Sequence, residues 1–253
     1  MDGFRIEIDG CPVAADVPRI AALGGYGHFT AMQVRDGRTR GLALHLRRLD
    51  DATRELFGVP LAGDLVRDRV RHALGADVRD ASVRVYVYHG PDGALSTVVT
   101  VRPPAPAPPA PQGLHAVPYQ RPVAHLKHLG GFAQEYYRRQ ARRKGFDEAL
   151  LTVAGWVVAE GAITNVGFVD GSTVVWPDAP ALAGITMQLL AQRVPARRAT
   201  VRLRDLPSFD GIFVTNSHGV AAVDRVDDLA APVPDRAMAA LTEAYASVPW
   251  DPI

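Results

Sequence analysis

The stretch FDEALLTVAGWVVAEGAITNVGFV, residues 146–169, decides the fold. Two apolar runs, near residues 148–153 and 157–160, are separated by Gly155, and a third run begins after the tripeptide ITN. Short runs rich in valine and leucine that are bounded by turn residues predict buried β-strands. Glu160 ends the second run, and because an unpaired buried charge is costly, it is expected to need a partner, for which one of the many arginines is the plain candidate.

The rest of the second half continues this alternation of strands and helices. A strand is predicted at 114–119, a helix at about 132–144, and a hairpin at 166–177 that turns at a glycine. A helix is predicted after Gly184, and strands near 198–203 and 211–215 precede a C-terminal helix at 235–248.

The first half has hairpins that flank two helices. Its strands are predicted at 4–9, 28–35, 82–90 and 95–102. One helix, 42–58, places Leu42, Leu46, Leu49, Thr53 and Leu56 along one face and ends at Gly58, and a second helix follows at 64–75. Hairpins with interspersed helices predict an α+β fold with mixed lobes, and argue against a doubly wound sheet.

The sequence PPAPAPPAPQG at 103–113 is the clearest boundary in the chain. Prolines fix φ and remove backbone donors, which favours an extended linker. The predicted division is therefore an N-terminal lobe at 1–102, a linker at 103–113 and a C-terminal lobe at 114–253.

Composition excludes several classes of function. The net charge is +1, so no global charge favours nucleic acid or a membrane surface, and the basic cluster at 138–144 has the spacing of a solvated helix face. The single cysteine, Cys11, cannot form an internal disulfide or a metal site, so no metal is expected. No apolar window is long enough for a membrane span and no signal peptide is visible, which favours the cytoplasm.

Familiar catalytic signatures such as CxxC, HExxH, GxSxG and the Walker loop are absent from the sequence, and what remains is a set of polar residues at the ends of elements. Lys127 lies in VAHLKHLGG without neighbouring charges, so it is either a lysine with a readily lost proton and a nucleophilic amine or a lysine that snorkels from a strand end. GIT at 184–186 suits a phosphate or a plain helix cap, and NSHG at 216–219 supplies polar donors or an ordinary turn.

Taken in order, these segments resemble a known family. HLRRL, the isolated Lys127, FDEALLTVAGWVVAEGAITNVGFV, LAGIT and FVTNS follow the pattern of class IV (fold type IV) pyridoxal-phosphate enzymes. That group includes branched-chain aminotransferases, D-amino-acid aminotransferases and aminodeoxychorismate lyases. The resemblance covers nearly the whole chain and implies two lobes with pyridoxal 5'-phosphate bound between them.

The resemblance also implies roles for individual residues. Lys127 matches the lysine that forms a Schiff base with the cofactor and moves protons, and Glu160 matches the carboxylate that faces the ring nitrogen. Arg48 matches the phosphate-binding arginine. The remaining matched positions are the contacts to the phosphate and an asparagine near the cofactor: Ile185, Thr186, Asn216, Ser217 and Asn165.

The first lobe departs from the family pattern on the substrate side. Where the family has a GDG turn, the chain has Gly25-Tyr26-Gly27, and positions often filled by arginine hold Gln33 and His89. The cofactor contacts are kept, while the substrate and its stereochemistry stay open. The residues predicted to line the substrate pocket, or alternatively to pack the lobe, are Tyr26, His28, Gln33, Tyr86, Tyr88 and His89.

We therefore expect an aminotransferase that moves an amino group between an amino acid and a 2-oxo acid. The first alternative is a lyase of the aminodeoxychorismate type, which shares every cofactor contact but releases pyruvate and 4-aminobenzoate. The second is a protein of the same fold that only binds ligands or works without the cofactor. The resemblance also implies a homodimer, and no nucleic-acid or membrane partner is expected.

Overall fold

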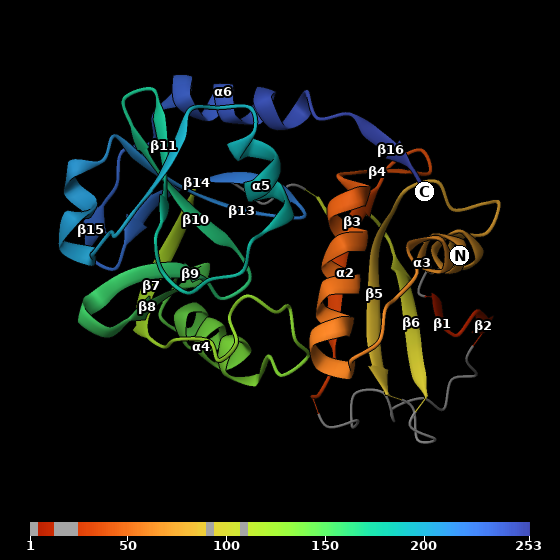
Figure 1. Ribbon diagram of the computed structural model, residues 1–253. Coiled ribbons are helices and arrows are strands. Elements are labelled where there is room, and N and C mark those ends of the chain that lie inside the picture. Colours follow the sequence, from red (N-terminus) through yellow and green to blue (C-terminus); the bar gives the residue numbers. More distant parts are fainter. Residues whose placement is uncertain (1–4, 13–24, 90–93, 107–110) are drawn as a thin grey trace. The chain divides into compact units, whose positions relative to one another are not determined.

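The computed structural model of the chain describes residues 5–12, 25–89, 94–106 and 111–253, which fall into two compact units (Figure 1). The first unit comprises Met1–Ala105, Leu126–Gly131 and Pro249–Ile253, and the second comprises Pro106–His125 and Phe132–Val248. The first crossing between the units lies within the predicted 103–113 linker, of which residues 107–110 are outside the described part. The short segment that contains Lys127 belongs to the first unit, although the residues on both sides of it belong to the second.

The described part of the first unit contains a five-stranded antiparallel sheet in the order β2-β1-β6-β5-β3. Its strands are β1 (Arg5–Ile8), β2 (Cys11–Pro12), β3 (His28–Val34), β5 (Ala81–His89) and β6 (Leu95–Arg102). Helices α2 (Leu42–Phe57) and α3 (Gly63–Leu74) pack against the sheet and bury Leu49, Val66 and Val70 against Met32 and Val85 (Figure 1). This arrangement follows from the alternation of the strands, which directs every second side chain of β3 to the helices.

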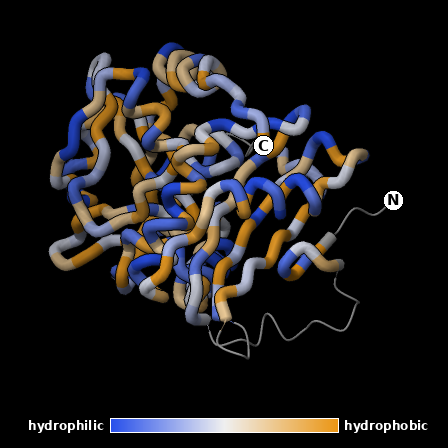
Figure 2. Tube along the Cα trace, turned by 45° about the vertical axis from the view of Figure 1, so that its right-hand side comes forward, coloured by the Kyte–Doolittle hydropathy of each residue, from blue (hydrophilic) through white to orange (hydrophobic). Residues whose placement is uncertain are grey.

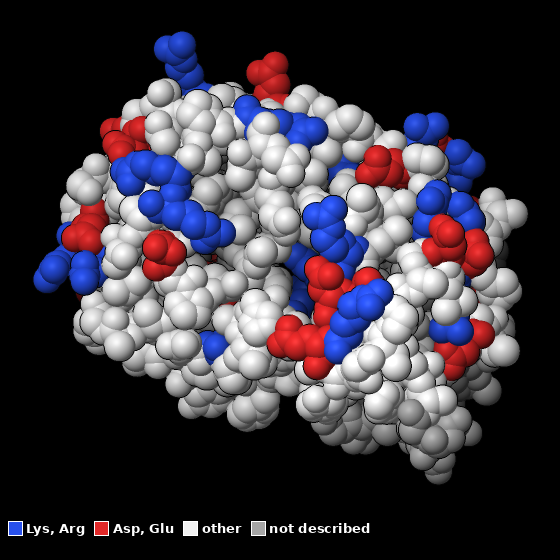
Figure 3. Space-filling model, in the orientation of Figure 1, with Lys and Arg blue, Asp and Glu red and all other residues white. Residues whose placement is uncertain are grey.

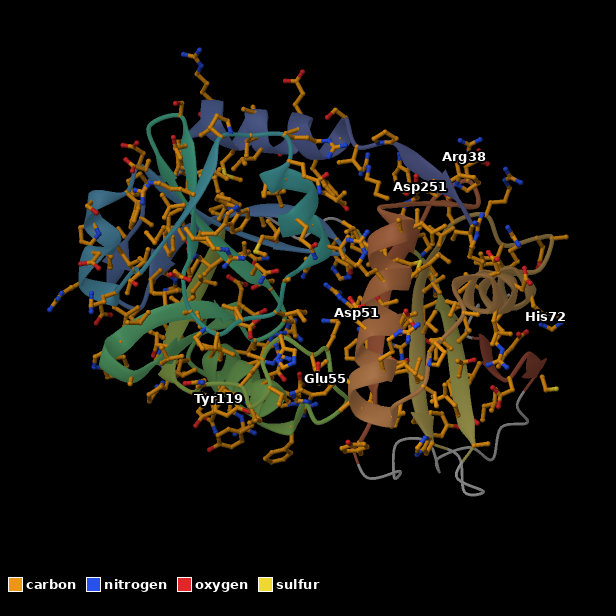
Figure 4. All side chains as sticks on the ribbon, in the orientation of Figure 1. Arg38, Asp51, Glu55, His72, Tyr119 and Asp251 are labelled. Atoms are coloured by element: carbon orange, nitrogen blue, oxygen red, sulfur yellow. The ribbon has the colours of Figure 1, made fainter. Side chains whose placement is uncertain are left out.

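The C-terminal residues complete the first unit. Strand β16 (Trp250–Pro252) pairs with β4 (Arg38–Arg40), where Figure 4 labels Arg38 and Asp251. The Asp251 carboxylate accepts a hydrogen bond from the backbone N–H of Leu42, 2.9 Å away, and this N–H is the first of α2. A carboxylate at this position accepts a hydrogen bond from a helical N–H that has no partner within the helix. It is also stabilised by the positive N-terminal end of the helix dipole. At its other end α2 ends at Gly58 with φ 73°, which confirms the predicted cap.

The described part of the second unit contains a nine-stranded mixed sheet in the order β12-β11-β10-β13-β14-β7-β8-β9, with β15 paired to β14. Its strands are β7 (Gln112–Pro118), β8 (Glu148–Val153), β9 (Val157–Gly161), β10 (Asn165–Asp170), β11 (Thr173–Pro177), β12 (Ala196–Ala199), β13 (Gly211–Asn216), β14 (Gly219–Val226) and β15 (Leu229–Ala230). Helices α5 (Ile185–Ala191) and α6 (Asp235–Ala246) cover one part of the sheet around Phe213 and Trp176, and α4 (Phe132–Arg143) packs near β7 and β8.

Two details of the second unit differ from the expectations. The strand predicted near 198–203 is wrong in its second half, because β12 ends at Ala199 and a 3-10 helix begins at Leu203. The Asp205 carboxylate accepts a hydrogen bond from the backbone N–H of Arg202 at 2.8 Å, which fixes the start of that helix. Strand β14 was not predicted at all, yet it joins the two halves of the sheet between β13 and β7.

Charged side chains of both signs lie on the surface of the described part of the chain. Figure 3 shows basic and acidic side chains interspersed over the visible face, and Figure 2 shows hydrophilic and hydrophobic residues distributed along the whole of the described tube. On α4, the Arg139 guanidinium lies 2.7 Å from the Glu135 carboxylate, one turn away, as on a solvated helix face. No helix within the described ranges combines the length and the apolar character that a bilayer crossing requires.

Candidate active site

Lys127 lies on a short segment that follows the edge of the first unit's sheet. The Lys127 carbonyl accepts a hydrogen bond from the Phe29 N–H at 2.9 Å, and the Leu129 N–H donates to the Gly27 carbonyl at 2.9 Å. The Lys127 side chain is half-buried, and its Nζ lies 4.8 Å from the centre of the Phe29 ring. The amine is therefore held against an aromatic face, which stabilises a cation and removes part of its hydration.

Helix α2 brings two further polar groups to the electrostatic environment of Lys127. Arg48 is half-buried, whereas Arg47 is exposed, as expected for neighbours on a helix. His45 is buried, and its Nδ1 lies 2.7 Å from the Thr30 hydroxyl. Burial lowers the pKa of His45 to about 3, and the positive charges of Arg48 and Lys127 act in the same direction. His45 is therefore neutral at physiological pH.

The residues predicted for the substrate pocket divide between the two faces of the first unit's sheet. Tyr26, His28 and His89 surround the ring of Phe57 at the end of α2, with ring centres 5.9, 6.1 and 4.4 Å from it. His28 is fully buried, and its Nε2 lies 2.9 Å from the Thr53 hydroxyl, so it packs within the unit.

The other three lie on the opposite face, together with Phe29. The Tyr86 ring stacks on the Phe29 ring with centres 5.4 Å apart, and Tyr88, two residues further along β5, faces the same way. Gln33 is used structurally, because its amide donates to the Ser82 hydroxyl at 3.0 Å. Lys127 Nζ also lies over the Phe29 ring. The sheet face that carries Phe29 and Tyr86 is therefore the face next to the Lys127 amine.

Glu160 is buried at the end of β9 in the second unit, where it has two strong partners. Its Oε1 accepts a hydrogen bond from Arg121 Nη1 at 2.9 Å, and its Oε2 accepts one from the Leu182 N–H at 3.1 Å. The side chains of Arg121 and Glu160 are 3% and 5% exposed. The partner that the sequence predicts for Glu160 is therefore an arginine, Arg121.

A series of contacts connects Glu160 to the start of α5. The Leu182 carbonyl accepts a hydrogen bond from Asn165 Nδ2 at 2.7 Å, so Asn165 and Glu160 hold the same residue from its two backbone sides. A Cβ added to Gly184 would lie 1.8 Å from Asn165 Oδ1, so only glycine fits before the helix. Asn165 therefore fixes the loop that leads to Ile185 and Thr186.

The two predicted phosphate-contacting segments also meet. The Thr186 hydroxyl donates to the Asn216 carbonyl at 2.6 Å, and the Asn216 side-chain oxygen accepts from the His218 N–H at 2.8 Å. Thr186 is buried, whereas Asn216 and Ser217 are half-buried at the end of β13. Within the second unit, hydrogen bonds thus link Glu160 and Asn165 through Leu182, and Thr186 directly to Asn216. Ile185 and Ser217 are the chain neighbours of this second pair.

Three charged residues of these surroundings were not among the predicted site residues. Arg121 is buried beside Glu160, and its signal in the sequence was an arginine within the mostly apolar stretch before Lys127. Arg84 lies on β5, with its guanidinium carbon 6.0 Å from the centre of the Phe29 ring. Glu148 is buried at the start of β8, and burial raises its pKa to about 7.

These residues fit the groups of pyridoxal phosphate. Each carboxylate oxygen has two lone-pair sites, so an oxygen of Glu160 that accepts from Arg121 or Leu182 can also accept from a protonated ring nitrogen. The amine of Lys127 suits an aldehyde, and the guanidinium of Arg48 suits a phosphate. The donor set therefore has the chemistry that the cofactor requires.

The fold and these residues define a class of protein with two mixed α/β units. One unit carries a half-buried lysine, and the other carries a buried carboxylate whose two oxygens each accept a hydrogen bond. The family described as amino-transferase class IV matches residues 27–226, and the chain belongs to this family. Its membership confirms the resemblance read from the sequence and makes the protein an enzyme of the aminotransferase class. No curated protein matches the chain.

Solved structures confirm the α+β fold as fold type IV. A hypothetical aminotransferase from Mycobacterium tuberculosis in its PLP-bound form is 21% identical, with a TM-score of 0.81 and coverage of 96% of this chain and 98% of that one. A T.th. branched-chain amino acid aminotransferase, complexed with N-(5'-phosphopyridoxyl)-L-glutamate, is 18% identical, with a TM-score of 0.81 and coverage of 96% and 92%. The 4-amino-4-deoxychorismate lyase from Pseudomonas aeruginosa is 26% identical, with a TM-score of 0.78 and coverage of 94% and 97%. The predicted cofactor agrees with the bound forms of the first two.

Proposed function

We propose that the protein is a pyridoxal-phosphate-dependent aminotransferase that moves an amino group between an amino acid and a 2-oxo acid. The observation that carries this proposal is the buried Glu160 carboxylate, which is held by donors on both oxygens and whose oxygens can each accept a further bond from a cationic ring nitrogen. When bound, pyridoxal phosphate supplies an aldehyde for amines and a ring that accepts an electron pair.

The chain's own residues then have distinct roles. The Lys127 amine would hold the aldehyde of the cofactor and would take up the proton that leaves the substrate α-carbon. Glu160 holds a proton on the ring nitrogen by opposing its charge. His45 stays neutral beside the amine, because burial lowers its pKa to about 3, so it adds no competing positive charge.

Phosphate binding is assigned to Arg48, to the backbone of Ile185 and Thr186, and to Asn216 and Ser217. The Thr186 hydroxyl hydrogen is used by the Asn216 carbonyl, so this side chain joins the two turns and leaves the backbone N–H groups to act as donors. Asn165 acts through the loop it holds, and it positions those N–H groups relative to Glu160.

The substrate side is proposed from the charges next to Phe29. Lys127 Nζ and the Arg84 guanidinium both lie near this ring, and Tyr86 stacks on it. Two cations at an aromatic surface favour anionic substrates, which the carboxylates of amino acids and 2-oxo acids provide.

The test uses the chain's two lysines, Lys127 and Lys144. Borohydride treatment of protein incubated with pyridoxal phosphate should fix the cofactor to the peptide that contains Lys127. Lys127→Arg should abolish both fixation and activity, while Lys144→Arg is the matched control and should leave both unchanged. Fixation on Lys144, or undiminished fixation in Lys127→Arg, would remove the basis of the proposal.

A lyase of the aminodeoxychorismate type is the second candidate, and the 26% identity to the Pseudomonas aeruginosa lyase favours it. The two activities are separated by a half-reaction screen with L- and D-amino acids. An aminotransferase converts the bound cofactor with at least one donor, whereas the lyase releases 4-aminobenzoate from aminodeoxychorismate without an oxo-acid acceptor.

The homodimer and the cytoplasmic location stay predictions. Light scattering of the purified protein tests the first, and a mass of about twice 27.2 kDa is expected. Fractionation of the producing cells tests the second.

A further inference from the structure

Arg121 is a buried cation whose guanidinium meets the carboxylate assigned to the cofactor. Arg121 Nη1 lies 2.9 Å from Glu160 Oε1, and both side chains are almost inaccessible to solvent. A charge-assisted hydrogen bond at this distance favours the ionised form of the carboxyl group. The Leu182 N–H on the other oxygen acts in the same direction and fixes the plane of the carboxylate.

The same Arg121 nitrogen also holds the turn that leads to Lys127. It donates to the Ala124 carbonyl at 3.1 Å. Between them lies Val123 with φ 41°, a backbone conformation that β-branched residues rarely adopt. Lys127 follows Ala124 by three residues, so one guanidinium fixes both the carboxylate and the backbone immediately before the amine.

We propose that Arg121 is a positioning residue for the cofactor's ring nitrogen: it keeps Glu160 ionised and oriented, so that the ring nitrogen stays protonated through the reaction. This inference rests on the proposed function. The alternative is an ion pair that serves stability only, and the two differ in whether the protonation of bound pyridoxal phosphate depends on Arg121.

The first experiment uses the cofactor-free protein. The carboxyl carbon of Glu160 is followed by NMR in protein with 13C-labelled glutamate, and Glu160→Gln identifies the signal. In Arg121→Met the buried carboxyl group loses its cation, so its titration midpoint should rise by about 2 pH units or more. Arg121→Lys keeps the charge and should restore most of the wild-type behaviour, and it also serves where Arg121→Met does not fold. An unchanged midpoint in Arg121→Met overturns the proposal.

The chain offers a matched control in Arg138, which faces the buried Glu148 in the same unit at 3.8 Å. Arg138→Met removes a guanidinium next to a buried glutamate without touching Glu160. It should leave the Glu160 midpoint where it is in the wild type. A shift as large as that in Arg121→Met would mean that the effect is a general loss of positive charge, and would overturn the specific role.

The second experiment binds pyridoxal phosphate labelled with 15N in the ring. The wild-type signal should stay that of a protonated ring nitrogen between about pH 6 and 9, because an ionised partner raises the pKa of a cationic group. Arg121→Met should show the loss of that proton within the same range, and Arg121→Lys should suppress it. Identical 15N signals in Arg121→Met and wild type overturn the positioning role.

The two experiments separate the failure of this inference from that of the proposed function. If the wild-type protein does not take up pyridoxal phosphate, the proposed function fails and the cofactor role of Arg121 fails with it. If the wild type binds the cofactor normally and only Arg121→Met is without effect, the proposed function stands and the inference alone is lost.

Discussion

Two glutamates of the second unit, Glu148 and Glu160, are buried to the same extent but are held in different ways. Their exposed fractions are 3% and 4%. Glu160 meets Arg121 at 2.9 Å, a hydrogen-bonding distance, whereas Glu148 meets Arg138 Nε at 3.8 Å, which is too long for one. Among the described residues, Arg138 Nε has no hydrogen-bond partner.

The difference teaches that burial beside an arginine does not by itself stabilise a carboxylate. For Glu148, burial is the larger effect and raises the pKa to about 7, while Arg138 and the backbone N–H groups of Ala149 and Ile163 only lower it in part. For Glu160, both oxygens are occupied by close donors. An ionised carboxylate is therefore expected at Glu160, whose hydrogen bonds are short, and a protonated carboxyl group is favoured at Glu148, whose contact with an arginine is long.

Removing Arg121 should have the largest effect on stability. Arg121→Met leaves the Glu160 charge buried without its cation, and breaking such a pair costs about 3–5 kcal/mol. Urea unfolding of Arg121→Met, Glu160→Gln and the double variant measures the coupling between the two residues. Arg138→Met should cost distinctly less, because its contact is not a hydrogen bond. Equal losses of unfolding free energy in Arg121→Met and Arg138→Met would show that the two glutamates do not differ in how strongly their arginines stabilise the fold.

Glu148 should make stability depend on pH in the opposite sense to most carboxylates. Its pKa in the folded state, about 7, is above the ordinary value of 4.5, so folding favours the protonated form. The stabilising contribution is therefore full below about pH 4.5 and is lost as the pH rises through 7. Glu148→Gln mimics the protonated form, and at about pH 8 it should be more stable than the wild type by up to about 3 kcal/mol.

The measurement is the difference in unfolding free energy between Glu148→Gln and wild type from about pH 4 to 8. The difference should grow through neutral pH. Two histidines give the opposite slope in both proteins and cancel in the difference: burial lowers the pKa of His28 to about 4 and that of His45 to about 3, so their contribution is lost as the pH falls below 6.5. A difference that does not vary with pH would show that Glu148 is ionised in the folded protein.

The first unit differs from both glutamate sites, because its buried histidine His28 is neutral and is held by a hydroxyl group. The Thr53 hydroxyl donates to the Leu49 carbonyl at 2.7 Å, so it accepts from His28 Nε2, which must carry the hydrogen. Thr53→Val leaves this buried N–H without its acceptor and should cost about 1–3 kcal/mol. Thr53→Ser loses the methyl but keeps the hydroxyl, and it is the control in the same urea titration. A Thr53→Val variant as stable as the wild type would show that the hydrogen bond to His28 does not stabilise the unit.

Much of this arrangement could be predicted from the sequence, because local patterns carry it. The alternation in β3 and the apolar face of α2 indicated the core of the first unit, and Gly58 indicated the end of the helix. The strand pair around Gly155 and the carboxylate at its end were likewise predicted, since Glu160 ends an apolar run. These features depend on neighbours within a few residues.

The features that the sequence did not reveal depend on pairing between distant residues. Strand β14 has a polar interruption at Asp224 and Arg225, and its place beside β7 follows from a parallel pairing that no local pattern encodes. Arg121 and Glu160 are 39 positions apart, and Arg121 was one arginine among many until the fold brought the two together. The sequence left open which residues face Lys127, because His28 and Tyr86 lie on opposite faces of one sheet.

The smallest effect on stability is expected from replacing an exposed charge, that of Arg84. Its replacement can therefore reveal an effect on substrate binding without an effect on folding. Its guanidinium lies near the Phe29 ring and 3.5 Å from the Tyr86 hydroxyl on the surface of β5, so Arg84→Gln should change stability by less than about 0.5 kcal/mol. If the face with Lys127 receives the carboxylate of a 2-oxo acid, the same variant should raise KM about tenfold, a loss of about 1.4 kcal/mol, both for a dicarboxylic oxo acid and for one with a neutral side chain. Arg84→Lys keeps the charge and should recover most of the loss. A rise for the dicarboxylic acid alone would assign Arg84 to a side-chain carboxylate of the substrate, and an unchanged KM for both would place the substrate away from this face of the sheet.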